Sequence, residues 1–194
     1  MQINADLAAG QRWSDDVALL GRWRLGDEDA GQRLFERHFD DIYRFFRNKC
    51  GDAADDLVQR TFLACIQARE RFRGDSSFRT YLFGIARNEL LSYLRRHSND
   101  GDKLDFGVTS LGEIVTTPAT KLARDQASER LRIALTQLSV DEQLLLELSY
   151  WHDMDATALG QIFEVPPATI RTRLRRARLA LHETLVESES GTSR

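Results

Sequence analysis

Hydrophobic residues recur at helical spacing through most of the chain, and this pattern predicts an all-α protein. In the first half we expect four helices, each with an apolar stripe that can face a shared core. Gly26-Asp27 and Gly51-Asp52 are typical of helix stops, and the polar segment 72–77 separates the third helix from the fourth. The predicted helices cover residues 15–26, 29–50, 54–70 and 78–97.

The apolar stripes of these helices give a list of candidate core residues. The second helix would bury a broad stripe, and the third and fourth would each bury a narrower one. Together the three stripes contain Leu34, Phe35, His38, Ile42, Phe45, Phe46, Leu57, Phe62, Cys65, Ile66, Leu82, Ile85, Ala86, Leu90 and Leu94.

Helical periodicity fails between Ser98 and about Thr120, where Gly, Asp, Ser and Thr are frequent and Pro118 occurs. Such a composition is typical of a flexible linker, which we place at residues 99–120. The linker divides the chain into two small helical domains, residues 15–98 and 121–187. Residues 1–14 and 188–194 are predicted to be polar tails.

The second half begins with a predicted helix over residues 121–137. Ser139 and Glu142 then have the S-x-x-E spacing of a capping box, which predicts a helix running to about Trp151. A short helix, a Pro166-Pro167 turn and a longer helix follow between Asp155 and Arg178, as in a helix-turn-helix. The residues expected to face one another across the two helices are Leu159, Ile162, Phe163, Ile170, Leu174, Ala177 and Leu181.

The sign of the charge reverses at this turn. Residues 141–164 contain six acids and neither Lys nor Arg, whereas residues 166–182 contain five arginines and no acid. The whole chain has a formal net charge of -3 and a sequence pI near 5.8, so a basic field must be local. We expect the acidic part to weaken non-specific DNA binding or to meet a different partner.

The positions of the arginines on the last helix favour DNA binding over a merely solvated basic face. At 100° per residue, Thr172, Arg175 and Arg176 lie opposite the apolar stripe, where they would reach base edges, while Arg173 and Arg178 would hold phosphates. A basic run on the final helix of a bundle is the alternative, but it leaves the sign reversal unexplained. The predicted DNA-binding residues of this helix are Thr169, Arg171, Thr172, Arg173, Arg175, Arg176 and Arg178.

Four passages, in order, resemble the extracytoplasmic-function sigma factors, the minimal two-domain class of the sigma-70 family of RNA polymerase subunits. They are residues 52–62 with their D-D-hydrophobic-V-Q segment, residues 72–96, residues 135–151 and the helix-turn-helix. The resemblance covers nearly everything from about Asp15 to Leu185. It implies a sigma-2-like four-helix domain and a sigma-4-like helix-turn-helix domain.

The resemblance also implies a role for each passage. The first passage would bind the clamp of the largest subunit of the bacterial RNA polymerase core, through Asp55, Asp56, Val58 and Gln59. The last would recognise the upstream (-35) promoter element. The second would recognise the downstream (-10) element and capture a flipped base during melting, through Phe72, Arg73, Asp75, Ser76, Phe78, Tyr81, Arg87 and Asn88.

Two departures from the family pattern concern the helix-turn-helix. Pro166 and Ala168 stand where the family commonly has a small polar cap and then glycine, and Leu159-Gly160-Gln161-Ile162 stands near its usual E-I-A. A helix start without a side-chain acceptor is expected to leave the turn less stable. Ordinary core packing remains an alternative for Phe78, Tyr81 and Phe83, as solvated surface acids do for Asp55 and Asp56.

Further partners follow from the resemblance. Free members of the family are commonly held by an anti-sigma factor that covers both domains, and a flexible linker would allow that compact arrangement. No run of about 18 apolar residues predicts membrane insertion, and no signal peptide is evident, so we expect a cytoplasmic protein that is nucleoid-associated when it is in the holoenzyme.

Other functions have weaker signals. His38 and Asp41 have the spacing of metal ligands on a helix, but no second ligand pair matches them, and no P-loop, GxSxG or HExxH occurs. We therefore expect neither enzyme activity nor a cofactor. Cys50 and Cys65 are interpreted as small apolar residues, with redox sensing or metal binding as alternatives. A helix-turn-helix regulator that binds duplex DNA without polymerase is the second hypothesis for function.

Overall fold

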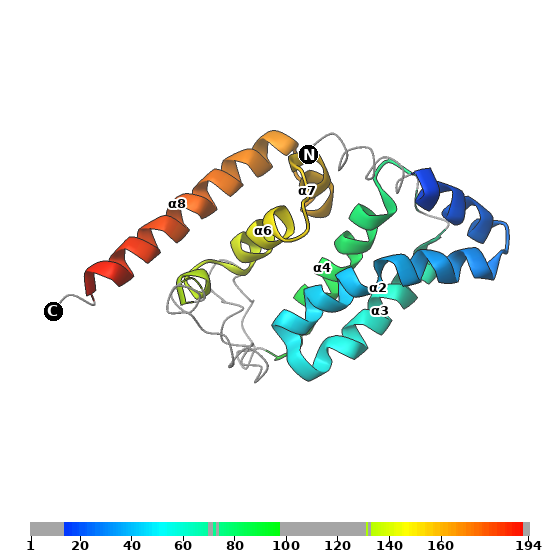
Figure 1. The fold of residues 1–194 in the computed structure, drawn as a ribbon, viewed down its shortest axis with the longest axis horizontal. Helices are drawn as coiled ribbons and strands as arrows, with labels where there is room; N and C mark the ends of the chain where they lie inside the picture. Colours follow the sequence, from blue (N-terminus) through cyan, green and yellow to red (C-terminus); the bar gives the residue numbers. More distant parts are fainter. Residues whose placement is uncertain (1–13, 70–71, 73, 98–130, 132, 192–194) are drawn as a thin grey trace.

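A computed structural model of the chain describes residues 14–69, 72, 74–97, 131 and 133–191, and these residues form helices and connecting segments without a strand (Figure 1). Residues 14–24 and 133–136 are also helical. The main elements are α2 (Glu28–Cys50), the 3-10 turn η1 (Gly51–Ala53), α3 (Ala54–Ala68), α4 (Phe78–His97), α6 (Val140–Tyr150), α7 (Ala156–Ile162) and α8 (Pro167–Gly191).

Side-chain caps fix the starts of several helices. Asp27 Oδ1 accepts a hydrogen bond from the Ala30 amide at 3.1 Å at the start of α2. The capping box predicted before α6 is confirmed: Ser139 Oγ accepts from the Glu142 amide at 3.3 Å, and Glu142 Oε2 accepts from the Ser139 amide at 3.0 Å. Asp155 Oδ1 accepts from the Thr157 and Ala158 amides at 3.0 and 2.8 Å, which fixes the start of the helix-turn-helix.

The first half is a four-helix domain whose core is built mainly from aromatic and leucine side chains. Phe45 and Phe46 of α2 are fully buried and lie edge to face at 5.2 Å, and Leu57 and Leu82 of α3 and α4 are equally buried. One expectation is wrong, because Ile66 is 40% exposed. The inward stripe of α3 runs instead through Leu57, Thr61 and Cys65, at the i, i+4, i+8 positions of one helix face.

In the second half, α7 and the first part of α8 pack as the apolar pattern predicts. Leu159 and Ile162 of α7 are buried, as are Ile170, Leu174 and Ala177 of α8. Phe163 is 7% exposed, and Leu181 packs against the same cluster while remaining partly exposed. These contacts make one two-helix unit with α6 beside it.

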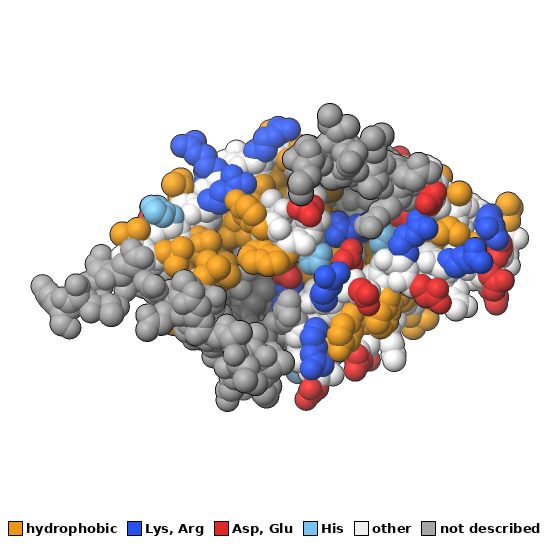
Figure 2. Space-filling view, in the orientation of Figure 1, with side chains coloured by type: hydrophobic (Ala, Val, Ile, Leu, Met, Phe, Trp, Pro, Cys, Tyr) orange, Lys and Arg blue, Asp and Glu red, His pale blue; other side chains and the backbone are white. Residues whose placement is uncertain are grey.

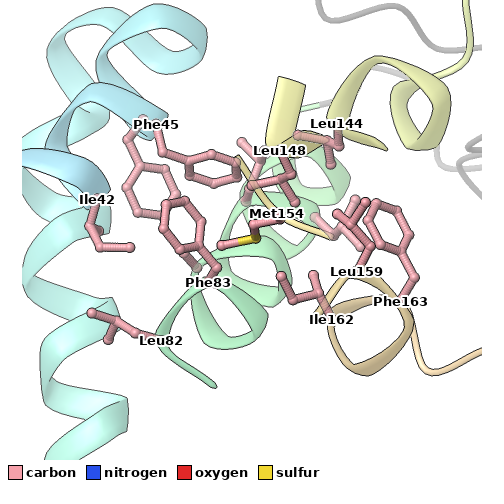
Figure 3. Packing of buried hydrophobic residues seen from close by; sticks show 14 of the residues in the cluster. Ile42, Phe45, Leu82, Phe83, Leu144, Leu148, Met154, Leu159, Ile162 and Phe163 are labelled. Carbon is pink, nitrogen blue, oxygen red and sulfur yellow. The ribbon is translucent and has the colours of Figure 1, made fainter. Parts of the chain in front are cut away.

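The two halves are joined by a single hydrophobic cluster that extends from one to the other. The buried side chain of Met154 lies between Phe45 and Phe83 of the first half and Leu148, Leu159 and Ile162 of the second (Figure 3). Helix α4 runs beside α7 at this junction (Figure 1). The predicted linker, residues 99–120, lies outside the described residues.

Candidate nucleic-acid and protein interfaces

The turn between α7 and α8 brings two backbone segments unusually close together. The Val165 amide donates to the Gly160 carbonyl at 2.9 Å, and a Cβ built on Gly160 would come within 2.8 Å of the Val165 carbonyl oxygen. Any larger residue at 160 would therefore displace the turn. This contact gives a physical reason for a glycine at one of the departures from the family pattern.

The same turn contains a non-glycine residue in the left-handed region. Glu164 has a φ of 56° and its side chain is exposed. At the start of α8 the backbone supplies the acceptor, since the Pro166 carbonyl accepts from the amides of Thr169 and Ile170 at 2.9 and 3.2 Å. Pro167 occupies the first helical position, where its missing amide hydrogen is of little consequence.

The polar face of α8 is open to solvent along its length. All five arginines and Thr172 are exposed, whereas Thr169 is only half-exposed. Thr172 Oγ1 donates to the Ala168 carbonyl at 3.2 Å, and the Arg178 guanidinium lies 5.5 Å from the centre of the Tyr150 ring. Basic side chains stand along the outer edge of α8 in Figure 2. The predicted recognition residues are therefore accessible, and Arg178 is held against α6.

The aromatic rings of Phe72, in the segment before α4, and of Phe78, at the start of α4, are buried and not exposed as base-capturing rings would be. Phe72 and Phe78 are 6% and 2% exposed, and Phe72 packs against half-buried Tyr81 with a ring separation of 4.7 Å. These aromatic rings form the floor of the loop. The side chains that remain at its surface are exposed Asp75, half-exposed Ser76 and, on α4, exposed Asn88. Arg73 lies outside the described residues.

An arginine from another helix supports the floor of this loop. Arg24, in the helical stretch 14–24, donates to the Arg69 carbonyl through Nη2 and Nε at 2.9 and 3.2 Å. Its Nη2 also donates to the Phe72 carbonyl, and its guanidinium lies 5.9 Å from the centre of the Phe72 ring. Arg24 thus satisfies carbonyls at the end of α3 and beyond it. The sequence contained no signal for this long-range cap.

Arg87, predicted to contact DNA, is occupied by the second half of the chain. Its Nη2 donates to Asp141 Oδ1 of α6 at 2.7 Å, and its guanidinium lies 4.5 Å from the centre of the Phe163 ring. The Arg87 side chain is 15% exposed, and its buried Nε has no hydrogen-bond partner in the structure.

Two further basic residues of the first half contact the second half. Arg79 donates to Asp41 Oδ2 at 2.9 Å and to the His152 carbonyl at 2.7 Å. Lys49 Nζ donates to Glu147 Oε1 at 2.6 Å and to the Phe45 carbonyl at 2.5 Å, and the Lys49 side chain is 5% exposed. Burial lowers the pKa of Lys49, and the Glu147 carboxylate opposes that change.

The acidic segment at the start of α3 presents most of its predicted residues to solvent. Asp55, Asp56 and Gln59 are exposed, and Asp56 forms an ion pair with Arg60 at 2.8 Å. Val58 is only 3% exposed, so its side chain belongs to the core and is not available to a partner. Its role in this segment is to hold α3 in place.

Sequence reasoning missed an apolar continuation of this surface. Leu63 and Ile66 are 53% and 40% exposed and follow Asp56 and Gln59 on one face of α3, at helical spacings of three and four. Phe39 of α2 is 45% exposed and stacks on Phe62 at 6.2 Å. The sequence of α3 contains apolar residues on two sides of the helix, and comparing these two sides could have revealed the second, exposed face. We call Asp55, Asp56, Gln59, Leu63, Ile66 and Phe39 the α3 face.

The residues weighed as metal ligands or redox groups have structural partners or are buried. His38 Nε2 lies 2.8 Å from Asp16 Oδ2, and Asp41 pairs with Arg79 and Arg44. Burial raises the pKa of Cys50 and of Cys65 to about 12, so both remain thiols at neutral pH.

The described part of the chain contains no cluster of three or more His, Cys, Asp or Glu side chains arranged to hold a metal ion. None of the helices in the described ranges has the length and apolarity needed to cross a membrane.

Comparison with known proteins identifies both halves. Residues 34–99 match the family model of sigma-70 region 2, and residues 128–181 match that of sigma-70 region 4. The ECF RNA polymerase sigma factor SigC of Mycobacterium tuberculosis is 38% identical over 187 residues, covering 87% of this chain and 91% of SigC. The sigma factor YlaC of Bacillus subtilis is 30% identical over 167 residues, covering 82% and 94%.

Two solved structures share the fold. CnrH, in complex with the cytosolic domain of CnrY, has a TM-score of 0.64 at 21% identity, covering 89% of this chain and 98% of CnrH. The Bartonella quintana sigma factor RpoE, crystallised with the anti-sigma factor NepR, has a TM-score of 0.59 at 24% identity, covering 79% of this chain and 95% of RpoE.

Proposed function

The chain belongs to the extracytoplasmic-function sigma factors of the sigma-70 family, and from that premise we propose how its surfaces divide the work of transcription initiation. The protein is an alternative sigma factor, which directs RNA polymerase to promoters. The observation that carries the proposal is that region 2 and region 4 are both present, each with an accessible surface of the required chemistry. A regulator acting without polymerase would need only the second of these.

Helix α8 would read the upstream promoter element in the major groove. Its arginines and Thr172 are exposed on the side opposite the buried Ile170, Leu174 and Ala177. Arg175 and Arg176 are suited to guanine, the commonest specific contact of arginine in DNA. Arg173 and Arg178 would bind phosphates and set the register. Thr169 and Arg171 complete this surface near the start of the helix.

The segment from Phe72 to Asn88 would hold the downstream element in single-stranded form. Its buried aromatic rings support a surface on which Asp75, Ser76 and Asn88 can hydrogen-bond an unstacked base. Arg87 would bind the strand once it is released from Asp141. Tyr81 remains partly accessible beside Phe72, in a position to stack.

The α3 face would bind the clamp of the largest polymerase subunit. Its acids would orient the encounter with basic residues, while Leu63, Ile66 and Phe39 supply apolar area at the centre of the contact. An exposed apolar group bordered by charges is typical of a protein-binding surface.

Several parts of the proposal concern the whole chain. The domains are assigned to residues 15–98 and 121–187, with the linker between them. CnrH was solved with the cytosolic domain of CnrY, and RpoE was solved with the anti-sigma factor NepR. We assign this chain an anti-sigma factor, a non-catalytic role and a site of action in the cytoplasm, on the nucleoid when it is in the holoenzyme.

Run-off transcription with purified core polymerase on a promoter library tests the proposal. The wild-type chain is expected to select start sites, and Asp56→Arg is expected to lose core binding while keeping its fold, because it reverses an exposed charge on the α3 face. Glu36→Arg, an equal change at an exposed position of α2, is the matched control. Tight binding to an operator without any binding to core would support a polymerase-independent regulator instead.

A further inference from the structure

The helical stretch 14–24 makes none of the contacts proposed above with DNA or polymerase, yet it holds the backbone beneath the surface that would bind an unpaired strand. We propose that this stretch is a positioning element for that surface and that Arg24 is its positioning residue. The inference rests on the proposed function and names what sets the geometry of one site. We call this site the strand-holding surface: Asp75, Ser76 and Asn88 above the rings of Phe72, Phe78 and Tyr81.

Arg24 joins the end of α3 to the floor of the strand-holding surface. Its Nη2 and Nε donate to the Arg69 carbonyl at 2.9 and 3.2 Å, and its Nη2 also donates to the Phe72 carbonyl. Its guanidinium lies 5.9 Å from the centre of the Phe72 ring. Hydrogen bonds from a charged donor are roughly twice as strong as neutral ones. The position of Phe72 therefore depends on a residue 48 positions earlier in the chain.

The two ends of the segment before α4 are anchored in different ways. Ser77 Oγ accepts a hydrogen bond from the Thr80 amide at 3.0 Å, so the far end has a cap of its own at the start of α4. The near end is held from outside the segment, by Arg24. Gly74, with a φ of 81°, makes the turn between the two anchors, and residues 75–76 follow it directly. A displaced near anchor would therefore shift residues 75–76 relative to α4.

The stretch 14–24 is itself firmly attached to α2. The Asp16 side chain is 5% exposed, accepts from Arg37 Nη1 at 2.8 Å and lies 2.8 Å from His38 Nε2. Trp23 is 5% exposed and meets the Phe35 ring edge to face at 5.1 Å. Because both ends of the stretch have buried anchors, Arg24 is presented to its carbonyl acceptors from a fixed support.

Phe72 in turn fixes the ring on which a base would stack. Its ring centre is 4.7 Å from that of Tyr81 and 6.3 Å from that of Phe78. Tyr81 is half-buried, so part of its ring remains open to an unstacked base. A supporting group that is misplaced by about 1 Å is enough to weaken a binding site. Arg24 thus acts on the base through Phe72 and Tyr81, without contacting the base.

The test measures the base-dependent part of strand binding in the holoenzyme. Purified core polymerase with the full-length chain is bound to a promoter fragment from the run-off selection whose downstream element is left unpaired. An abasic site is then placed at each position of the non-template strand of that element in turn. We call the largest ratio of the abasic to the intact dissociation constant the abasic penalty. Phosphate contacts cancel in this ratio, since they are the same in both probes.

We expect an abasic penalty on the order of tenfold for the wild type, because stacking and hydrogen bonds to one base are lost. In Arg24→Gln it should fall below ~3-fold, since the stacking ring is no longer held in place. Arg24→Lys should give an intermediate value, because an ammonium still donates to a carbonyl but lacks the planar fork. Arg22→Gln, at an arginine 56% exposed on the same stretch, is the matched control and should keep the wild-type penalty.

Two binding measurements separate positioning from general loss of structure. Affinity for core and for duplex upstream element should be unchanged in Arg24→Gln, because the α3 face and the arginines of α8 do not contact Arg24. Lower stability alone would reduce binding of intact and abasic probes alike. An Arg24→Gln variant that keeps the wild-type abasic penalty would therefore overturn the positioning role, whatever its stability.

Asp16→Asn provides a second variant in case Arg24→Gln does not fold. It weakens the attachment of the stretch to α2 with little change of shape, and it should lower the abasic penalty by at least ~2-fold. A wild-type penalty in this variant would count against the stretch as a support. If the wild type itself shows no penalty at any position, base capture fails, and the positioning inference fails with it. A wild-type penalty that the variants retain rejects the positioning inference alone.

Discussion

At the scale of single residues, Glu164 has a backbone conformation that is unfavourable for any residue with a Cβ. Its φ of 56° is a conformation in which a side chain Cβ costs about 1–2 kcal/mol, whereas glycine adopts it readily. We expect Glu164→Gly to raise the free energy of unfolding by about 1 kcal/mol, because part of the gain is offset by the greater freedom of an unfolded glycine. Chemical denaturation at neutral pH measures the difference.

Glu164→Ala is the control for this prediction. It removes the same charge but keeps the Cβ, so its free energy of unfolding should stay close to that of the wild type. If alanine stabilises the chain as much as glycine does, the gain comes from the charge and the conformational argument is wrong.

Two arginines of α8 allow base and phosphate contacts to be told apart. Arg176→Ala should weaken binding to the upstream element by about 1–3 kcal/mol and relax its sequence preference, because the variant lacks the bidentate base contact that we propose for Arg176. Arg178→Ala, at an arginine held against Tyr150, should weaken binding to all sequences and lower the salt slope by about one. Equal losses on native and scrambled promoters for Arg176→Ala would contradict the base-contact assignment.

The sequence predicts which side chains of α8 are exposed, but it does not predict this for the aromatic residues at the start of α4 and before it. On α8 the apolar stripe fixes which side faces the core, and the exposed side follows from the 3.6-residue period. Phe72 and Phe78 stand in a segment without periodicity, where an aromatic ring serves equally well as core or as a stacking surface. Only the packing against Tyr81 decides that both rings are buried.

At the scale of elements, the end of α3 depends on an arginine from a different helix. Arg24 satisfies carbonyls at Arg69 and Phe72, and hydrogen bonds from a charged donor contribute about 1.5–3 kcal/mol. Arg24→Gln should therefore lower the free energy of unfolding by on the order of 2 kcal/mol and accelerate hydrogen exchange across residues 69–77.

Arg22→Gln is the matched control on the same helical stretch. Arg22 pairs with Asp27 at the surface, so its loss should change stability less and leave exchange across residues 69–77 as it was. If both variants accelerate that exchange equally, the effect is general loosening of the stretch 14–24. The capping role of Arg24 would then be wrong.

Most element boundaries followed from local chemistry. The capping box at Ser139, the Pro-Pro turn and the polar break before α4 each lie where the sequence predicts them. Two of the differences, exposed Ile66 and the overlooked α3 face, have a common cause. Helix α3 has two apolar stripes, and periodicity cannot tell which one meets a partner outside the chain.

At the scale of the whole molecule, the packing of the two halves against each other buries the ring of His152, which lies against Phe45 and Phe83. Burial first, and then the positive charge of Arg79, lowers the pKa of His152 to about 4 from an ordinary value of 6.5. If the halves separate, His152 becomes more exposed and binds a proton at pH values between 4 and 6.5, so protonation of His152 favours separation of the halves. The contact between the halves is therefore most stable above pH 6.5 and should weaken as the pH falls towards 4. The charged groups around the ring are Arg79, Asp41, Lys49, Arg44 and Glu147.

Scattering or hydrogen exchange over residues 75–90 at pH 7.5 and pH 5 measures this response. His152→Gln should reduce the change between the two pH values, whereas His182→Gln, at an exposed position of α8, should leave it intact. A response of the same size in both variants would assign the pH dependence to other groups.

The contact between the halves was the part of the molecule least accessible from sequence. The charge pattern left two expectations for the acidic remainder of the chain, weaker non-specific DNA binding or a different partner, and nothing local to Asp141 or Glu147 identifies such a partner. Arg87 and Lys49 lie 54 and 98 positions away from those acids, on the other side of the linker. Such a pairing depends on the packing of whole domains, which periodicity does not describe.

The recognition arginines of α8 stand apart from both the hydrophobic cluster and the contact between the halves. Promoter choice can consequently be redesigned as a separate module. Exchanging the outward positions of α8 while retaining Ile170, Leu174 and Ala177 should give variants that fold alike and address different genes, a useful property for building synthetic circuits from one scaffold.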